Sequence, residues 1–240
     1  HGGTLPADVM PVFQNTGKEH EATLIFLREM AERWSCPITW LEFTLVDGVK
    51  GFRVVDFCSA SRKGEPFEAV ILNRGYPPNP MVRHCTVELK IRTGTRYAKS
   101  LGWDEVTRAV GIRADEPRRV ARMKGDSAGE NVVMPIAKAG HTEADVLAFW
   151  KAQPFDLMLP GGDNTFGNCD LCFLKGRAKI EKIIRTNPHA AGAASRDAEV
   201  GKLQDALRVI VRAWDDDEIG QVDGSLIEAA RLALTNGGAA

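Results

Sequence analysis

Two cysteines separated by two residues lie in the glycine-bounded segment GNCDLCFLKG, residues 167–176. The thiols of Cys169 and Cys172 have the spacing at which a single loop binds a metal ion or cluster. A redox-active dithiol and a pair of inert packing residues are the alternative interpretations. Structural zinc sites and iron–sulfur clusters use three or four ligands, so the pair predicts further ligands elsewhere in the chain.

The best candidate for a third ligand is Cys85, which lies 84 residues before Cys169 in the basic segment RHCTVELK. His84 and Cys58 are candidates for a fourth ligand. Three thiolates that leave one iron open would suit a [4Fe–4S] cluster that acts on a substrate. Zinc completed by a histidine is the alternative, and a lone cysteine is otherwise most often a buried apolar side chain.

Two further segments end a predicted strand in a glycine turn and offer groups that bind anions. In QNTGKEHEAT the turn Asn15-Thr16-Gly17 leads into a helix, where backbone amides and a hydroxyl can hold a ribose or a phosphate. In AVGIRADEPRRVAR the strand is followed by Arg113, and an arginine fork binds phosphate or sulfate in a bidentate manner. An ordinary strand-to-helix turn and a solvated arginine-rich helix are the corresponding structural interpretations.

Charge is unevenly distributed along the 240 residues, although the whole chain has a formal net charge of −1. Residues 83–124 contain eleven Lys and Arg against five Asp and Glu, a surplus of six positive charges. The rest of the chain therefore carries a net charge of −7. A local basic block on an otherwise acidic protein indicates binding of a compact polyanion, such as a nucleotide, rather than coating of a nucleic acid.

These candidate residues are spaced along an alternation of strands and helices. Apolar periodicity and turn residues predict strands at residues 8–14, 38–45, 52–57, 106–112 and 132–136. They predict helices at residues 21–34, 66–74, 85–101, 142–150 and 175–185. Such alternation is typical of an α/β fold in which helices cover both faces of a parallel sheet. Ligands of these sheets bind beyond the carboxyl ends of the strands, where both glycine turns fall.

The remaining composition favours a cytoplasmic protein with one principal domain. No apolar run approaches the length of a membrane helix, and the N-terminal segment lacks the pattern of a signal peptide. Five cysteines, an odd number, argue against a disulfide framework and for a reducing compartment. We expect a nucleotide-binding domain over residues 1–188 and a tail of acidic helices over residues 189–240.

The chain resembles the phosphoadenosine phosphosulfate (PAPS) reductase family in five segments, which occur in the order QNTGKEHEAT, RHCTVELK, VGIRADEPRR, HTEADVLAFW and GNCDLCFLKG. This family belongs to the adenine nucleotide alpha-hydrolase superfamily, the PP-loop ATP pyrophosphatases. The likeness covers about residues 8–185 and is greatest to the phage-encoded and DNA-sulfur-modification branches. It implies a Rossmann-like parallel sheet with helices on both faces, which binds ATP or another adenylated nucleotide.

The resemblance also assigns roles by position. The residues that it implies for nucleotide binding are Asn15, Thr16, Gly17, Lys90, Gly111, Arg113 and Glu116. The residues that fall where iron–sulfur members hold their cluster are Cys85, Cys169 and Cys172. Lys90 corresponds to the lysine of the family's R-x-C-T-x-x-L-K stretch, and the G-x-R-x-x-E segment that begins at Gly111 approaches the phosphate or sulfate end of the nucleotide.

Two motifs of the family do not occur in these 240 residues. The S-G-G-x-[DT]-S loop, which cradles phosphates in the family, is expected upstream of His1. The segment His1-Gly2-Gly3-Thr4 is no substitute, because it precedes what resembles the second strand rather than following the first. The E-C-G-x-H motif of true sulfonucleotide reductases, whose cysteine attacks the sulfate sulfur, does not follow Cys172.

The resemblance therefore implies an enzyme that activates an acceptor with an adenine nucleotide and uses an iron–sulfur cluster in sulfur transfer. Its partners would be the nucleotide, a sulfur donor or acceptor, and a second copy in a homodimer. The second hypothesis is a sulfonucleotide reductase proper that takes its nucleophile from another chain. The third is a non-catalytic module that binds a nucleotide or a nucleic acid and keeps a structural metal.

Overall fold

The computed structural model describes residues 5–126 and 131–186, which fall into two compact units. The first unit contains residues 5–93 and 159–186, and the second contains residues 94–126 and 131–158. The expected acidic tail and the glycines at positions 2 and 3 lie outside the described residues. In the part of the chain that is described, no helix is long and apolar enough to cross a membrane.

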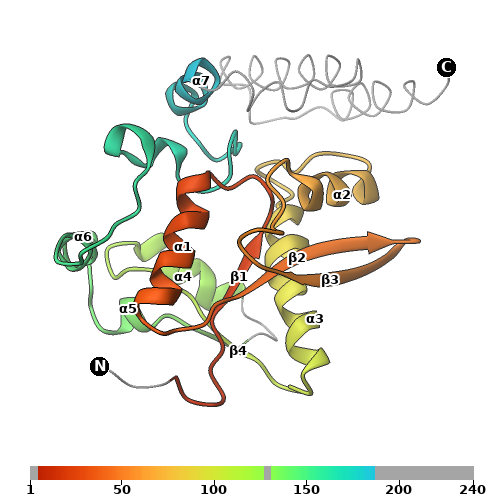
Figure 1. Ribbon diagram of the computed structural model, residues 1–240, viewed down its shortest axis with the longest axis horizontal. Coiled ribbons are helices and arrows are strands. Elements are labelled where there is room, and N and C mark those ends of the chain that lie inside the picture. Colours follow the sequence, from red (N-terminus) through yellow and green to blue (C-terminus); the bar gives the residue numbers. More distant parts are fainter. Residues whose placement is uncertain (1–4, 127–130, 187–240) are drawn as a thin grey trace. The chain divides into compact units, whose positions relative to one another are not determined.

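A three-stranded sheet with the strand order β1-β2-β3 forms the framework of the first unit (Figure 1). Strands β1 (Val12–Asn15) and β2 (Thr39–Val46) are parallel, and helix α1 (Glu21–Arg33) connects them. Strand β3 (Val49–Val55) is antiparallel to β2. The sheet is therefore mixed, and the α/β class expected from the sequence is confirmed.

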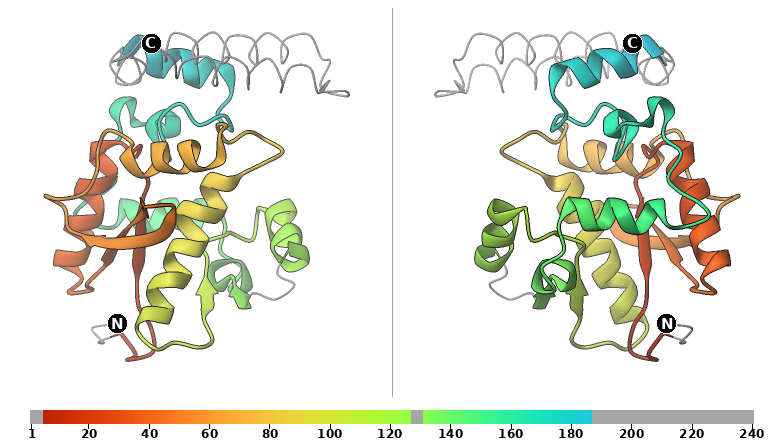
Figure 2. Two further views of the ribbon diagram at one scale, coloured as in Figure 1. Left: turned by 90° about the vertical axis from the view of Figure 1, so that its right-hand side faces the viewer. Right: turned by 90° about the vertical axis from the view of Figure 1, so that its left-hand side faces the viewer.

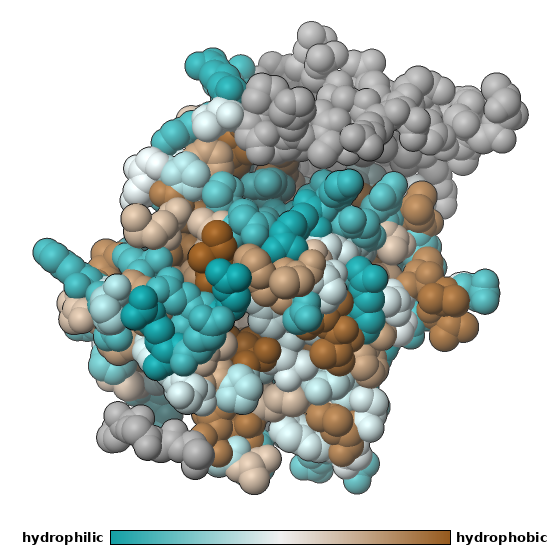
Figure 3. Space-filling view, viewed as in Figure 1, coloured by the Kyte–Doolittle hydropathy of each residue, from teal (hydrophilic) through white to brown (hydrophobic). Residues whose placement is uncertain are grey.

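The hairpin between β2 and β3 departs from the expected purely parallel sheet, and its turn explains why. Asp47 and Gly48 both have positive φ values, 50° and 77°. Two such residues are typical of a type I′ turn, which favours Asp-Gly and matches the twist of antiparallel strands. A two-residue turn is too short for a parallel crossover. Apolar side chains of Val46 and Val49 are exposed beside this turn, at the tip of the hairpin (Figure 3).

Helices cover both faces of this sheet. Side chains alternate between the two faces of a strand, so Trp40 and Phe43 of β2 point in opposite directions. Trp40 packs with Leu24 of α1 on one face. Phe43 packs on the other face with Val70 and Leu89, which lie on two further helices. The two small cores therefore hold α1 on one side of β2 and the other helices on the opposite side.

The two helices on the second face are α2 (Glu65–Arg74) and a π-helix, η1 (Cys85–Arg92). Helix η1 contacts α2, β1 and β2, and Figure 2 shows α2 and the β2–β3 hairpin beside it. It runs directly into α3 (Thr93–Ser100), so the helix predicted over residues 85–101 is confirmed. Stretches of π-helix are rare and frequently lie at functional sites.

The ends of the helices follow local signals that the sequence carries. Helix α1 begins after His20, whose side chain accepts a hydrogen bond from the N–H of Ala22 at 3.1 Å. Helix α2 ends at Gly75, which has the left-handed conformation (φ 76°) that glycine adopts most readily. The last described helix of this unit, α7 (Arg177–Thr186), confirms the basic helix predicted over residues 175–185.

The second unit contains a parallel pair of short strands, β4 (Thr107–Ala109) and β5 (Asn131–Val133). Its helices after α3 are α4 (Pro117–Asp126), α5 (Pro135–Lys138) and α6 (Glu143–Lys151). Helix α6 begins with a capping box of Thr142 and Asp145, at the start of the helix predicted over residues 142–150. The strand predicted over residues 132–136 ends early, because Pro135 begins α5 and a proline favours the first turn of a helix.

Candidate functional site

The cysteine loop is joined through its backbone to the turn that follows β1. Cys169 and Glu19 form an isolated antiparallel bridge, and the N–H of Asp170 donates to the carbonyl of Lys18 at 2.7 Å. Cys169 and Glu19 are 150 residues apart in the sequence. We call this junction the cysteine site, and it consists of the turn at residues 15–19, the loop at residues 167–176, and Cys85.

The side chain of Cys169 faces polar groups of the turn. Its Sγ lies 3.4 Å from Thr16 Oγ1 and 3.7 Å from Glu19 Oε1. The same carboxylate accepts hydrogen bonds from the backbone N–H and the hydroxyl of Thr16, each at 2.9 Å. Glu19 therefore stabilises the turn and at the same time offers an acceptor to the Cys169 thiol.

Two of the three cysteines named by the sequence, Cys85 and Cys169, have raised pKa values, and Cys172 acts electrostatically on both. Burial raises the pKa of the Cys169 thiol to about 11, Glu19 raises it further, and Lys90 opposes the shift. Burial also raises the pKa of Cys85. Cys172 contributes electrostatically to the raised pKa of both other thiols. The fold thus gathers Cys85 and the Cys-x-x-Cys pair in the first unit.

The loop that carries the pair has a strained backbone. Asn168 and Leu171 have positive φ values, 57° and 49°. An asparagine tolerates this left-handed conformation, whereas for leucine it costs roughly 1–2 kcal/mol. Leu171 lies between the two cysteines, so the strain is located where the loop orients both thiols.

The same loop holds two charged side chains, of which Lys175 is buried and Asp170 is half-buried. Lys175 Nζ donates to the carbonyl of Thr165 at 2.9 Å, and burial lowers the pKa of this ammonium. Burial raises the pKa of Asp170, and its Oδ1 has no hydrogen-bond partner among the described residues. The electrostatic attraction between Asp170 and Lys175 partly offsets the cost of burying both groups. A buried ammonium near the thiols would stabilise their deprotonated forms.

Metal ligation would need a rearrangement of these groups. Within residues 5–126 and 131–186, no three His, Cys, Asp or Glu side chains are arranged as a site that could hold a metal ion. A thiol must also lose its proton before it binds a metal, and the raised pKa of Cys169 opposes that loss. The chemistry of the donors therefore fits a metal or cluster, while in their present arrangement all three are free cysteines.

The side chain of Asn15 stabilises the turn at residues 15–19 through hydrogen bonds within the protein. It is fully buried, and its Nδ2 donates to Glu42 Oε1 at 2.6 Å and to the carbonyl of Ser61 at 2.8 Å. Its Oδ1 accepts the N–H of Gly17 at 3.1 Å. Its side-chain amide is thus hydrogen-bonded within the protein, which gives Asn15 a positioning role in the turn, and the nucleotide contact that the resemblance implied stays a prediction.

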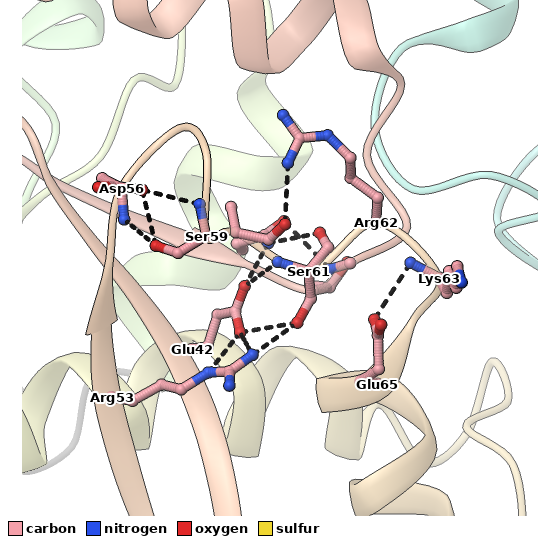
Figure 4. A network of polar contacts seen from close by, with 12 residues as sticks. Glu42, Arg53, Asp56, Ser59, Ser61, Arg62, Lys63 and Glu65 are labelled. Atoms are coloured by element: carbon pink, nitrogen blue, oxygen red, sulfur yellow. Dashed lines mark hydrogen bonds and ion pairs between the residues drawn. The ribbon is translucent and has the colours of Figure 1, made fainter.

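The partner of Asn15 is a buried glutamate at the centre of a polar network (Figure 4). Glu42 accepts hydrogen bonds from the N–H and hydroxyl of Ser61 at 2.6 and 2.8 Å and from both nitrogens of the Arg53 fork. Burial alone would raise the pKa of Glu42, but these hydrogen bonds together lower it below its usual value. The network fastens the loop between β3 and α2 to the carboxyl end of β1.

Gly17 is required by close backbone packing. Its φ value is 74°, and a Cβ at this position would lie 2.9 Å from the Cα of Gly64. Gly64 precedes α2 and also has a positive φ value, 94°. The predicted glycine turn is confirmed, and its function in the fold is to let the β1–α1 turn touch the loop before α2.

The other implied nucleotide-binding residues are distributed over both units. Lys90 is exposed on η1 in the first unit and acts on the pKa of Cys169. Gly111, Arg113 and Glu116 belong to the second unit. There, Arg113 Nε donates to Asp115 Oδ1 at 3.0 Å, and the guanidinium lies 3.9 Å from Glu116 and 3.6 Å from Glu143. A phosphate would have to compete with three carboxylates for this arginine.

The sequence did not identify several residues of the cysteine site. Glu19 was expected to be an acid in the first turn of a helix, yet it contacts Thr16 and Cys169. Lys175 was expected at the start of the basic helix over residues 175–185, yet it precedes α7 and is buried. A useful signal was the position of Lys175 three residues after Cys172, because a loop that places a thiol inside tends to bring its neighbours inside as well.

Comparison with known proteins gives one informative similarity. Over 181 residues, 72% of this chain, the sequence is 33% identical to a protein of Escherichia phage lambda described as "Uncharacterized nin region protein ORF290". The chain spans 59% of the length of that phage protein. No protein-family model matches the chain, and no solved structure matches it.

Proposed function

We propose that this protein is an adenine-nucleotide-binding enzyme of the PAPS reductase and PP-loop type, which uses a cysteine-held metal centre in sulfur chemistry. Its first unit would correspond to part of a Rossmann-like sheet, with the β1–α1 turn at the carboxyl end of a parallel strand. Such ends are the ligand-binding edge of α/β sheets. The similarity to a phage protein agrees with the phage-encoded branch that the sequence motifs favoured.

One observation carries the proposal: the turn after β1 and the cysteine loop are in direct contact. The 3.4 Å approach of Thr16 Oγ1 to Cys169 Sγ joins the segment proposed for the nucleotide to the segment proposed for the metal. A sulfur-transfer enzyme needs this proximity, because the activated group on the nucleotide must meet the sulfur chemistry.

The three cysteine ligands are compatible with two kinds of metal centre. Cys85, Cys169 and Cys172 would hold an iron–sulfur cluster with one open iron, or a zinc ion completed by a fourth ligand. Such a group would supply a site that binds and polarises sulfur. Glu19 would accept the proton that Cys169 releases, and Lys175 would offset the negative charge of the thiolates.

The nucleotide would contact backbone and cationic groups of the chain. Thr16 and Gly17 present the turn at the end of β1, and Lys90 offers a cation on the adjacent π-helix. Lysine binds phosphate as a point charge, so Lys90 would neutralise charge that develops on a phosphate oxygen.

A redox-active dithiol is less well supported by the same geometry. Reactive cysteines have lowered pKa values, because the thiolate is the nucleophile. The pKa of Cys169 is instead raised to about 11, so almost all of this thiol is protonated at neutral pH. Burial next to a carboxylate is the opposite of the electropositive environment that activates a thiol.

Anaerobic purification followed by iron, sulfide and zinc analysis tests the metal centre. We expect metal in the wild-type protein and its loss in the variants Cys85→Ser, Cys169→Ser and Cys172→Ser. Cys36→Ser is the matched control, because Cys36 is a free cysteine of the same chain outside the cysteine site and is not a candidate ligand. A metal-free wild-type protein, or equal loss in the control, would contradict the proposal.

Calorimetric titration with ATP tests the proposed nucleotide binding independently of the metal centre. The variant Lys90→Gln is expected to weaken binding about tenfold, which corresponds to one charge-assisted hydrogen bond to a phosphate. Lys151→Gln, which removes an exposed lysine of α6, serves as the control. Binding that is unchanged in Lys90→Gln would remove this residue from the proposed site.

A further inference from the structure

A second polar centre lies on the π-helix and is separate from the cysteine site. The Glu88 carboxylate is 1% exposed, and three cations contact its Oε1. Lys50 Nζ lies at 3.3 Å, an Arg74 nitrogen at 2.9 Å and an Arg92 nitrogen at 2.6 Å. These cations come from three different elements, because Lys50 is on β3, Arg74 at the end of α2 and Arg92 on η1.

The centre carries more positive charge than its carboxylate balances. Glu88 contributes one negative charge against three positive ones, so the four side chains have a surplus of two. In the described part of the chain, none of the three cations forms an ion pair with a second carboxylate. Cations that converge on one oxygen also repel one another, and this repulsion is strong in a partly buried environment. If Glu88 had only a structural role, one or two cations would be enough to neutralise its carboxylate.

The cations remain accessible from outside. The exposed fractions of the Lys50, Arg74 and Arg92 side chains are 28%, 36% and 53%. Each side chain is anchored through one nitrogen on the buried carboxylate and has further N–H groups to donate. Anchoring at one end reduces the side-chain entropy that a ligand would otherwise have to pay for.

A second observation points to the same place. His84 is buried, and neither its Nδ1 nor its Nε2 has a hydrogen-bond partner among the described residues. Its ring lies 5.2 Å from the ring of Tyr76. His84 directly precedes Cys85, the first residue of η1, and the same helix carries Glu88 and Arg92. A buried imidazole without partners is costly, and its N–H is a donor available to a ligand.

We propose that Lys50, Arg74 and Arg92 form a binding site for a phosphate group, with Glu88 as the residue that positions them. A phosphate group carries close to two negative charges, which matches the surplus of the centre. Two guanidinium forks and one ammonium supply the donors that phosphate oxygens prefer. The proposal goes beyond the sulfur chemistry and does not depend on a metal at the cysteine site.

Titration of the full chain with inorganic phosphate and with AMP tests this site, at an ionic strength held constant with chloride. Binding is measured by calorimetry and by the shift of the thermal unfolding midpoint. The variants Arg92→Gln and Lys50→Gln are expected to weaken phosphate binding at least about fivefold, because each removes one cation from a partly solvated cluster. Arg33→Gln is the matched control, since Arg33 also forms a 2.6 Å ion pair with the glutamate four residues before it.

Each outcome of this experiment decides the proposal. Weaker binding in both variants with unchanged binding in Arg33→Gln supports the site. Tighter binding of AMP than of phosphate, with the same sensitivity to Arg92→Gln, identifies a nucleotide phosphate as the ligand, and equal affinity identifies a free oxyanion. Equal binding in all three variants, or no binding of either probe at millimolar concentration, overturns the proposal. Circular dichroism of each variant separates loss of binding from loss of fold.

Discussion

Each face of the three-stranded sheet buries one glutamate, and the two glutamates are neutralised in different ways. Glu42 lies on the α1 face, opposite Asn15 and Arg53 in the strand register. Its two oxygens are satisfied by one arginine and by neutral donors. Glu88 meets the other face, where three cations share one of its oxygens. The single arginine at Glu42 balances the charge of the carboxylate, whereas the three cations at Glu88 leave an excess of two positive charges that a ligand could neutralise.

The number and charge of the groups around a buried carboxylate indicate whether it has a structural role or belongs to a binding site. A buried carboxylate that is saturated by short hydrogen bonds from neighbouring strands and loops is explained by the fold alone. A buried carboxylate with excess cations is not, because additional like charges cost free energy. We therefore expect substitutions at Glu42 to affect stability and substitutions around Glu88 to affect binding.

The largest effect is expected from Glu42→Gln. The variant leaves Arg53 without its carboxylate and puts an amide N–H₂ group against other donors, so we expect a loss of about 3 kcal/mol in the free energy of unfolding. Urea unfolding measures it, and Glu29→Gln, which breaks the exposed pair with Arg33, should cost less than about 0.5 kcal/mol. Similar values for the two variants would contradict a structural role for the Glu42 network.

A smaller effect, about 2 kcal/mol, is expected from Glu88→Gln, because the three cations are partly exposed and can move apart. Phosphate should restore part of this stability, since it replaces the lost negative charge. The unfolding midpoint with and without phosphate measures the rescue. Equal stabilisation of Glu42→Gln and Glu88→Gln by phosphate would contradict the difference between the two buried glutamates.

Ser61→Ala is expected to cost about 1 kcal/mol, because it removes the hydroxyl that bonds Glu42 and Arg53 but keeps the backbone N–H. Ser59→Ala in the same loop is the control (Figure 4). Its hydroxyl bonds only exposed groups of Asp56, so its loss should cost less. Equal costs would mean that the Glu42 network adds nothing to an ordinary turn.

The smallest effect is expected from mild acid. The pKa of folded Glu42 is below its usual value of 4.5, so its ionised form stabilises the fold above that pH. This contribution is lost as the pH falls through the lowered pKa of the folded state. Stability measured between neutral pH and about pH 4 should therefore decline less in Glu42→Gln than in the wild type. Parallel declines would show that Glu42 is not hydrogen-bonded as a carboxylate.

Local sequence signals predicted most of the helices but not the pairing of the strands. The Gly75 end of α2 and the capping box of Thr142 and Asp145 at the start of α6 depend only on neighbours within a few residues. The Asp47-Gly48 dipeptide also predicts a hairpin by itself, and the expectation of a purely parallel sheet overlooked it. The alternation of strands and helices is a weaker signal than a two-residue turn with a defined backbone.

The sequence alone determined which residues have chemistry to offer: the Cys-x-x-Cys pair, Cys85 and the glycine turn after β1. Only the tertiary structure decided that Thr16 lies against Cys169 and that Lys50, Arg74 and Arg92 converge on Glu88. Sequence patterns over a few residues predict the backbone conformation and the buried face of a single helix or strand. Contacts between residues 150 positions apart depend on strand register and packing, which those patterns do not contain.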